Sequence, residues 1–181
     1  MTTYISILRG INVSGQKKVL MADLKELYAS LGFTEVTTYI QSGNVIFKTS
    51  GDLSAGDLCN KIEKAIEGRY KFQVPVIIRN AGEINAILSS NPFLAEKGID
   101  PERLHVTFLG KDPQPSELSA ILKFDYPPDR FAIIGKEVYL YCPGGYGNTK
   151  LSNSFFENKL KVTATTRNWK TVGKLAELAS F

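Results

Sequence analysis

The chain has 181 residues, of which 43% are hydrophobic, and a formal net charge of +4 at pH 7. This length and apolar content suffice for one large or two small domains. The longest apolar runs, such as Val74–Ile78, are too short to span a bilayer, and the N-terminal segment lacks the pattern of a signal peptide. We therefore expect a cytoplasmic protein without membrane contact, whose mild positive charge permits phosphate-bearing partners without requiring them.

Cysteine and histidine are scarce, which limits the chemistry available to the chain. Cys59 and Cys142 are the two cysteines, and His105 is the single histidine. These residues cannot form a disulfide framework or a zinc site of the usual spacing, and no acidic cluster suggests an oxygen-ligand metal site. We expect no metal, no cofactor, a structural role for His105, and no Ser-His-Asp or Cys-His catalysis.

The first half of the chain has the pattern of a strand, a helix, two strands, a second helix and a fourth strand. In order, these elements are expected at residues 3–8, 21–31, 36–41, 44–48, 54–68 and 74–79. Gly32 and Gly68 are expected to end the two helices, and Ser42-Gly43 to form the hairpin turn. Pro75 has no N–H to donate to a neighbouring strand, so the fourth strand should lie at a sheet edge.

The second half repeats this order. Its elements are expected at residues 104–109, 116–122, 130–134, 137–142, 151–160 and 162–165, followed by a final helix from Trp169. The fold class is therefore α+β, a tandem βαββαβ arrangement of two ferredoxin-like subdomains with an extra C-terminal helix. We expect subdomains at residues 1–90 and 104–181, separated by a linker-like segment at 91–103.

The two halves differ in one connection. The spacing from Gly10 to Gly43 exceeds the spacing from Gly110 to Gly135 by eight residues. The extra residues are expected between the first strand and the first helix, in residues 11–20. A longer loop on a repeated scaffold is a common place for function.

In a βαββαβ sheet, the end of the first strand and the turn between the second and third strands lie at the same edge. Neither Arg9–Lys18 nor Tyr39–Asn44 contains an Asp or a Glu, whereas both segments are rich in hydrogen-bond donors. Such a set favours a phosphate, sulfate or carboxylate ligand and does not suit acid–base catalysis by paired carboxylates. The candidate ligand-binding residues are Arg9, Asn12, Lys17, Lys18, Gln41, Ser42 and Asn44. Alternatively, the three amides satisfy turn backbone and the lysines are solvated.

Two further segments add candidates. The glycine-rich stretch before residue 151 carries Lys150 near a helix start, although the spacing of a P-loop is absent. Near the C-terminus, Thr166 or Asn168 can cap the last helix. An arginine at a helix N-terminus opposes the helix dipole, so Arg167 should have an anionic partner within the protein or in a ligand.

Three motifs carry a resemblance to a known family. The motifs are LRGINVSGQKKVLMADLKELYASLGF, VTTYIQSGNVIF, and TKLSNSFFENKL with TATTRNWKTVGKLAEL. They are similar to the bacterial family called domain of unknown function 1697. The resemblance implies two ferredoxin-like subdomains, with exchange of their first strands left open, and it implies no activity or catalytic residue. The family's signature positions fall at residues 9–12, 41–44 and 166–169; Ser14 stands where a second glycine is commoner.

Three functions are compatible with these observations. The first is a binding module for an anionic, phosphate-bearing ligand, which can be a nucleotide, a nucleic acid or a phosphorylated metabolite. The second is a transferase that acts on a phosphorylated substrate by charge stabilisation, without a metal or a carboxylate pair. The third is an assembly protein that pairs through exposed edge strands. The sequence leaves open whether the protein is an enzyme, and also its oligomeric state.

Overall fold

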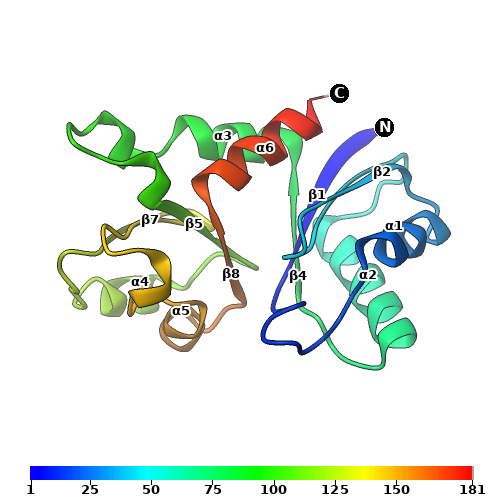
Figure 1. Ribbon diagram of the computed structural model, residues 1–181, viewed down its shortest axis with the longest axis horizontal. Helices are drawn as coiled ribbons and strands as arrows, with labels where there is room; N and C mark the ends of the chain where they lie inside the picture. Colours follow the sequence, from blue (N-terminus) through cyan, green and yellow to red (C-terminus); the bar gives the residue numbers. More distant parts are fainter. Residues whose placement is uncertain (181) are drawn as a thin grey trace. The chain divides into compact units, whose positions relative to one another are not determined.

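The strands form two four-stranded antiparallel sheets within residues 1–180, which the computed structural model describes (Figure 1). The strand orders are β2-β3-β1-β4 and β6-β7-β5-β8, so the second sheet repeats the first with the numbering advanced by four. Each sheet belongs to its own unit: unit 1 is Met1–Asn85 with the end of the chain from Leu175, and unit 2 is Ala86–Lys174. The mixed α and β content and the repeated strand order agree with the predicted element order.

Unit 1 contains four strands and two helices packed on one face of its sheet. Its elements are β1 (Thr2–Leu8), α1 (Met21–Ser30), β2 (Thr34–Tyr39), β3 (Asn44–Thr49), α2 (Ala55–Tyr70) and β4 (Val76–Asn80). Leu24 and Tyr28 of α1 and Ile62 of α2 are fully buried against Leu8 and Phe47 of the sheet. Because side chains alternate across a strand, β1 buries Leu8 and Ser6 on this helix-covered face and Ile7 on the opposite face.

Unit 2 has the same succession of elements. They are β5 (Leu104–Leu109), α4 (Pro115–Ile121), β6 (Arg130–Ile134), β7 (Glu137–Tyr141), α5 (Asn153–Leu160) and β8 (Ala164–Asn168). Ile121 of α4 and Phe156 of α5 pack on Leu109 and Leu140 of the sheet. The division between the units falls within two further helices, α3 (Ala81–Ser89) and α6 (Trp169–Ala179).

The edge strands β4 and β8 have their outward backbone groups satisfied by side chains in the same way. In β4, the N–H of Val76 donates to Glu63 Oε1 over 2.8 Å, and the Arg79 guanidinium donates to the carbonyl of Ile78 over 2.9 Å. Arg9 N donates to the carbonyl of Pro75, and this bond sets which backbone groups of β4 face β1. The N–H of Val76 and the carbonyl of Ile78 therefore face the free edge. An edge treated in this way presents fewer groups to another chain.

Unit 2 repeats this arrangement residue by residue. The N–H of Ala164 donates to Glu157 Oε1 over 3.1 Å, and the Arg167 guanidinium donates to the carbonyl of Thr166 over 3.0 Å. Each arginine is followed by an asparagine whose side chain caps the next helix. Asn80 Oδ1 accepts from the N–H of Glu83, and Asn168 Oδ1 accepts from the N–H of Thr171, each over 2.8 Å.

Two expectations about local structure need correction, and a third is confirmed. Gly68 does not end α2, which continues to Tyr70, where Lys71 adopts the left-handed conformation that closes the helix. The last strand is not 162–165 but Ala164–Asn168, because a polar run is paired with β5. Pro75 does precede an edge strand, as predicted.

Among residues 1–180, no helix has the length and apolar character needed to cross a membrane.

Candidate functional site

Three loops converge at one end of the unit 1 sheet, and we call this region the loop end. It comprises residues 9–20 between β1 and α1, residues 40–43 between β2 and β3, and residues 71–75 between α2 and β4. Its 21 residues include four basic side chains, those of Arg9, Lys17, Lys18 and Lys71, and no Asp or Glu. The predicted meeting of the first loop with the hairpin turn is therefore present in the structure.

Asn12 joins two of these loops through its side-chain amide. Asn12 Nδ2 donates to the carbonyls of Gln41 and Val19, each over 2.9 Å, while Asn12 Oδ1 accepts from the N–H of Val19 over 2.9 Å. One half-buried amide thus closes the first loop on itself and fixes it to the hairpin turn. Because both ends of this amide have backbone partners, Asn12 holds the loop in place, as the alternative interpretation of the sequence expected.

The first loop folds as a small hairpin rather than a flexible connection. Val13 and Gln16 form an antiparallel bridge, and the N–H of Asn12 donates to the carbonyl of Lys17 over 3.1 Å. Ser14 and Gly15 at the tip have φ of 51° and 72°, the two positive values of a type I′ turn. The tip is exposed to solvent. The extra residues of the first half therefore build an ordered projection: twelve residues connect β1 to α1, against five between β5 and α4.

The hairpin turn between β2 and β3 packs against the first loop. Gly43 has φ of 86°, and a Cβ there would lie 2.6 Å from Ile11 Cδ1 and 2.9 Å from Leu8 Cβ, so a glycine is required on both counts. The buried Asn44 donates from Nδ2 to the carbonyl of Tyr39 over 2.9 Å and to Ser42 Oγ over 3.2 Å. The side chains of Asn44 and Ser42 therefore stabilise the turn.

The third loop joins through Lys17, whose ammonium donates to the carbonyl of Gln73 over 2.7 Å and lies 6.0 Å from the Phe72 ring centroid. An ammonium has three N–H groups, and this bond uses one of them. A carboxylate does reach the border of the loop end, because Glu67 Oε1 of α2 accepts from Gln73 Nε2 over 3.3 Å. Lys18 is exposed and Arg9 is half-buried.

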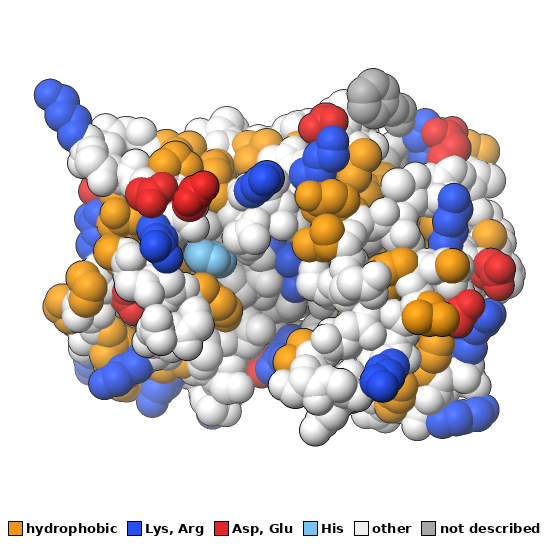
Figure 2. All heavy atoms as spheres, in the orientation of Figure 1, with side chains coloured by type: hydrophobic (Ala, Val, Ile, Leu, Met, Phe, Trp, Pro, Cys, Tyr) orange, Lys and Arg blue, Asp and Glu red, His pale blue; other side chains and the backbone are white. Residues whose placement is uncertain are grey.

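Charge over the wider surface is mixed. On the face drawn in Figure 2, the Lys and Arg side chains are spread out, with acidic side chains among them. A broad single-sign field is therefore absent from that face, and a preference for anions there has to come from a local arrangement of side chains.

The candidates of unit 2 occupy two different settings. Lys150 is exposed, and its ammonium lies 5.3 Å from the Tyr126 ring centroid at a cavity of about 220 Å³ that also contains Asp129. Arg167 lies in β8, one residue before Asn168, which caps α6, and 7% of its surface is exposed. Burial lowers the pKa of Arg167 to about 10. Its guanidinium donates to Thr165 Oγ1 and to the carbonyl of Thr166.

Sequence reasoning did not single out Arg79, which is 2% exposed. The available signal was the dipeptide Arg-Asn before a helix, which occurs at Arg79-Asn80 and again at Arg167-Asn168. Within the described residues, no group of three or more His, Cys, Asp or Glu side chains could hold a metal ion.

The fold and the loop end together define a protein of two βαββαβ units in which the longer β1–α1 connection of the first unit is ordered and rich in donors. The family model described as "Protein of unknown function (DUF1697)" matches residues 1–139, and the chain belongs to this family. The resemblance seen in the sequence is thereby confirmed.

A solved structure with the same fold is that of the conserved bacterial protein SP0830 from Streptococcus pneumoniae. It superposes with a TM-score of 0.76 at 24% sequence identity, over 99% of this chain and 99% of that chain. At this identity the similarity concerns the fold alone. No curated protein matches the chain.

Proposed function

We propose that the protein is a binding module for an anionic, phosphate-bearing ligand, which the loop end of unit 1 receives. The observation that carries the proposal is the convergence of three loops that contain four basic side chains and no carboxylate. Arg9, Lys17 and Lys18 supply the charge and the donors that a phosphate group requires. A nucleotide, a nucleic acid and a phosphorylated metabolite share this chemistry.

The backbone of the loop end supports the proposal. Within residues 1–180, five of the seven non-glycine residues with positive φ belong to its three loops: Asn12, Ser14, Lys17, Ile40 and Lys71. Such conformations cost free energy and persist where the surrounding structure fixes them, which is common at binding sites. The hydrogen bonds of Asn12 and Lys17 supply that fixation. A loop held in advance loses little conformational entropy when a ligand binds.

The comparison of the two units also supports this location. We infer that both units are ferredoxin-like and arose by duplication, because the strand order and the Glu, Arg and Asn contacts at β4 and β8 recur. On this basis the hairpin of residues 12–17 is an addition to a repeated scaffold, and additions of this kind often carry function.

The experiment compares binding by the full chain and by two charge-matched double variants. Fluorescence anisotropy is measured with a labelled single-stranded oligonucleotide and with a labelled ATP at low salt. Lys17→Ala/Lys18→Ala removes two charges from the loop end. Lys111→Ala/Lys123→Ala removes two charges from exposed positions of unit 2 and is the control.

We expect the loop-end variant to weaken binding by roughly tenfold or more, since each lost phosphate contact reduces affinity and its salt dependence. The control should bind as the unmodified chain does. A steep fall of affinity with salt identifies nucleic acid, and a shallow fall with one-to-one stoichiometry identifies a small ligand. The proposal would be contradicted if the full chain bound neither probe, or if both variants lost affinity equally.

A second candidate, an interaction protein, is favoured by a different observation. Val13, Leu20 and Ile40 of the loop end are 59%, 68% and 44% exposed. Apolar side chains gathered at one end of a unit can bury area against a partner. Light scattering of the full chain and of Val13→Ser/Ile40→Ser tests this candidate, which requires self-association that the variant loses. Pairing through β4 or β8 is less suited, because side chains already satisfy outward groups of both edges.

A further inference from the structure

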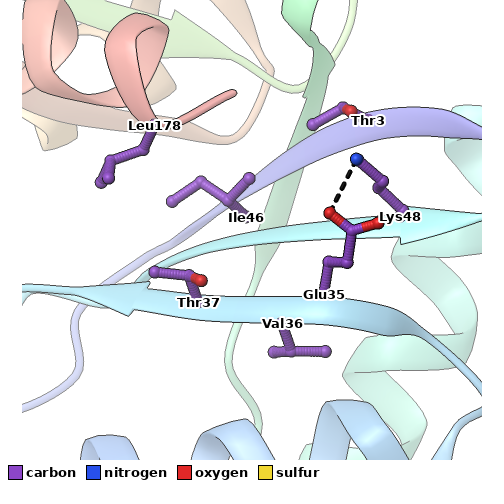
Figure 3. Close-up of a pocket in the computed structure, with 7 residues that line it drawn as sticks. All are labelled: Thr3, Glu35, Val36, Thr37, Ile46, Lys48 and Leu178. Atoms are coloured by element: carbon purple, nitrogen blue, oxygen red, sulfur yellow. Dashed lines mark ion pairs between the residues drawn. The ribbon is translucent and has the colours of Figure 1, made fainter. Parts of the chain in front are cut away.

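A cavity of about 290 Å³ opens on unit 1 away from the loop end (Figure 3). It lies on the sheet face opposite α1 and α2, where Ile46 and Lys48 of β3 alternate with the core residue Phe47. Its volume is at the lower end of the range for ligand pockets, which suits a small metabolite. The lining residues are Thr3, Glu35, Val36, Thr37, Ile46, Lys48 and Leu178.

A bulge in β2 shapes one wall of this cavity. Thr34 pairs with Lys48 and Thr37 pairs with Ile46, so two residues of β2 oppose the single residue Phe47 of β3. Glu35, one of the two, has φ of 50°, an unfavourable value for a residue with a long side chain. Bulges of this kind redirect a side chain, and here the carboxylate of Glu35 is directed to Lys48.

The polar end of the cavity is an ion pair. Lys48 Nζ lies 2.7 Å from Glu35 Oε2, and the side chains are 21% and 61% exposed (Figure 3). The hydroxyl of Thr3, which pairs with Lys48 across the strands, lies beside this ion pair, whereas Thr37 of β2 pairs with Ile46 and lies toward the other end. The other end is apolar, with Ile46 of β3 and Leu178 of α6 facing the opening (Figure 3).

The charges of this pair select among ligands by sign. A simple anion near Lys48 is repelled by Glu35, and a simple cation near Glu35 is repelled by Lys48. A molecule with an ammonium and a carboxylate on neighbouring atoms places each charge beside its opposite, which makes a ring of four alternating charges. Its apolar substituent then contacts Ile46 and Leu178, while the hydroxyl of Thr3 can donate to its carboxylate.

We propose that this cavity binds a free α-amino acid with an aliphatic side chain. The ammonium of the ligand pairs with Glu35, its carboxylate pairs with Lys48, and its side chain packs between Ile46 and Leu178. The site is independent of the loop end, so either proposal can fail without the other.

The test is a chemical-shift titration of the full ¹⁵N-labelled chain with L-leucine as the probe. Three analogues each lack one feature: 4-methylpentanoate lacks the ammonium, 3-methylbutylamine lacks the carboxylate, and glycine lacks the aliphatic side chain. Glu35→Gln and Lys48→Met each remove one charge of the pair. Arg130→Met breaks the exposed Arg130–Glu96 pair of unit 2, whose atoms are 2.8 Å apart, and serves as the control.

We expect leucine to shift the amide signals of β2 and β3 around Glu35 and Lys48. Each analogue should bind roughly tenfold more weakly or worse, since each loses one contact. Both pair variants should weaken leucine binding, and Arg130→Met should not. Leu178→Ala should weaken leucine but leave glycine unchanged, which separates loss of the site from loss of the fold. Equal binding of leucine and 4-methylpentanoate, or no shifts in β2 and β3, would overturn the proposal.

Discussion

The side-chain amide of Asn12 donates a 2.9 Å hydrogen bond to the main-chain carbonyl of Gln41, 29 residues further along the chain. This bond fixes the hairpin of residues 12–17 to the turn between β2 and β3. The same amide also exchanges two hydrogen bonds with Val19, so one side chain both closes the first loop and fixes it to the turn. The contact of the first loop with the hairpin turn therefore depends on Asn12, and its contact with the third loop depends on Lys17.

Replacement of Asn12 by alanine should lower the free energy of unfolding by about 2 kcal/mol, since three hydrogen bonds are lost and the backbone groups can regain water only in part. Urea denaturation measures this change. Asn148→Ala is the control, because Asn148 is exposed and its side chain donates one hydrogen bond, to Gly144. The control should change stability by less than about 1 kcal/mol. Equal losses in the two variants would contradict the role given to Asn12.

Gly43→Ala and Gly15→Ala separate two costs at the loop end. Both glycines have positive φ, but a Cβ has nothing within 4 Å at Gly15 and would clash with Ile11 and Leu8 at Gly43. The backbone conformation alone should cost about 1–2 kcal/mol. Gly43→Ala should cost about 1–3 kcal/mol more, because the clash forces neighbours to move. Thermal unfolding of both variants checks the order, and a Gly43→Ala variant as stable as Gly15→Ala would show that the packing is looser than described.

The regular elements could be predicted from the sequence because their signals are local. Helical spacing of apolar residues identified α1 and α2, and Pro75 correctly indicated an edge strand. The end of α2 could not be predicted from Gly68, since Lys71 adopts the left-handed conformation itself. The bulge at Glu35 also left no local signal, because it depends on the register of β2 against β3.

The site was only partly predictable, for a related reason. Topology brought the first loop and the hairpin turn together as expected, but it could not tell which amides the backbone would use. The run Thr165-Thr166-Arg167-Asn168 was expected to leave the last strand at Thr165 and to lead into the helix from Trp169, with Arg167 near its N-terminus. In the structure this run is a strand, and the arginine serves the carbonyl of Thr166 at its edge. Such a role depends on tertiary pairing, which composition does not reveal.

The two cysteines make the stability of the fold depend on pH in the alkaline range. Burial raises the pKa of the Cys59 thiol and of the Cys142 thiol from an ordinary 9.0 to about 11. A group whose pKa is higher in the folded state than in the unfolded state stabilises the fold at pH values below the unfolded-state pKa. This contribution is lost as pH rises through the folded-state pKa. The free energy of unfolding should therefore decrease between about pH 9 and about pH 11. In Cys59→Ala/Cys142→Ala the decrease over this range should be smaller, and an unchanged decrease would contradict the burial of the thiols.

His105 makes the stability of the fold depend on pH in the acidic range. Burial lowers the pKa of His105 from 6.5, and the nearby charge of Arg103 acts in the same direction. The folded state then binds a proton less readily than the unfolded chain, so stability should fall as pH decreases below about 6.5. His105→Phe keeps a ring for the stacking contact with Tyr146, whose centroid is 4.9 Å away. Urea denaturation on both sides of this pH should show a smaller acid loss in the variant, and an equal loss would assign the effect to other groups.

The most direct test of the anion-binding proposal is a chemical-shift titration of the full ¹⁵N-labelled chain with inorganic pyrophosphate at low salt. Pyrophosphate carries the phosphate chemistry without a base or a sugar, so its binding reports recognition of the phosphate group alone. We predict saturable shifts of the amide signals in residues 9–18 and 40–44, with little change elsewhere. Shifts confined to other residues, or no saturable shifts at all, would contradict the account.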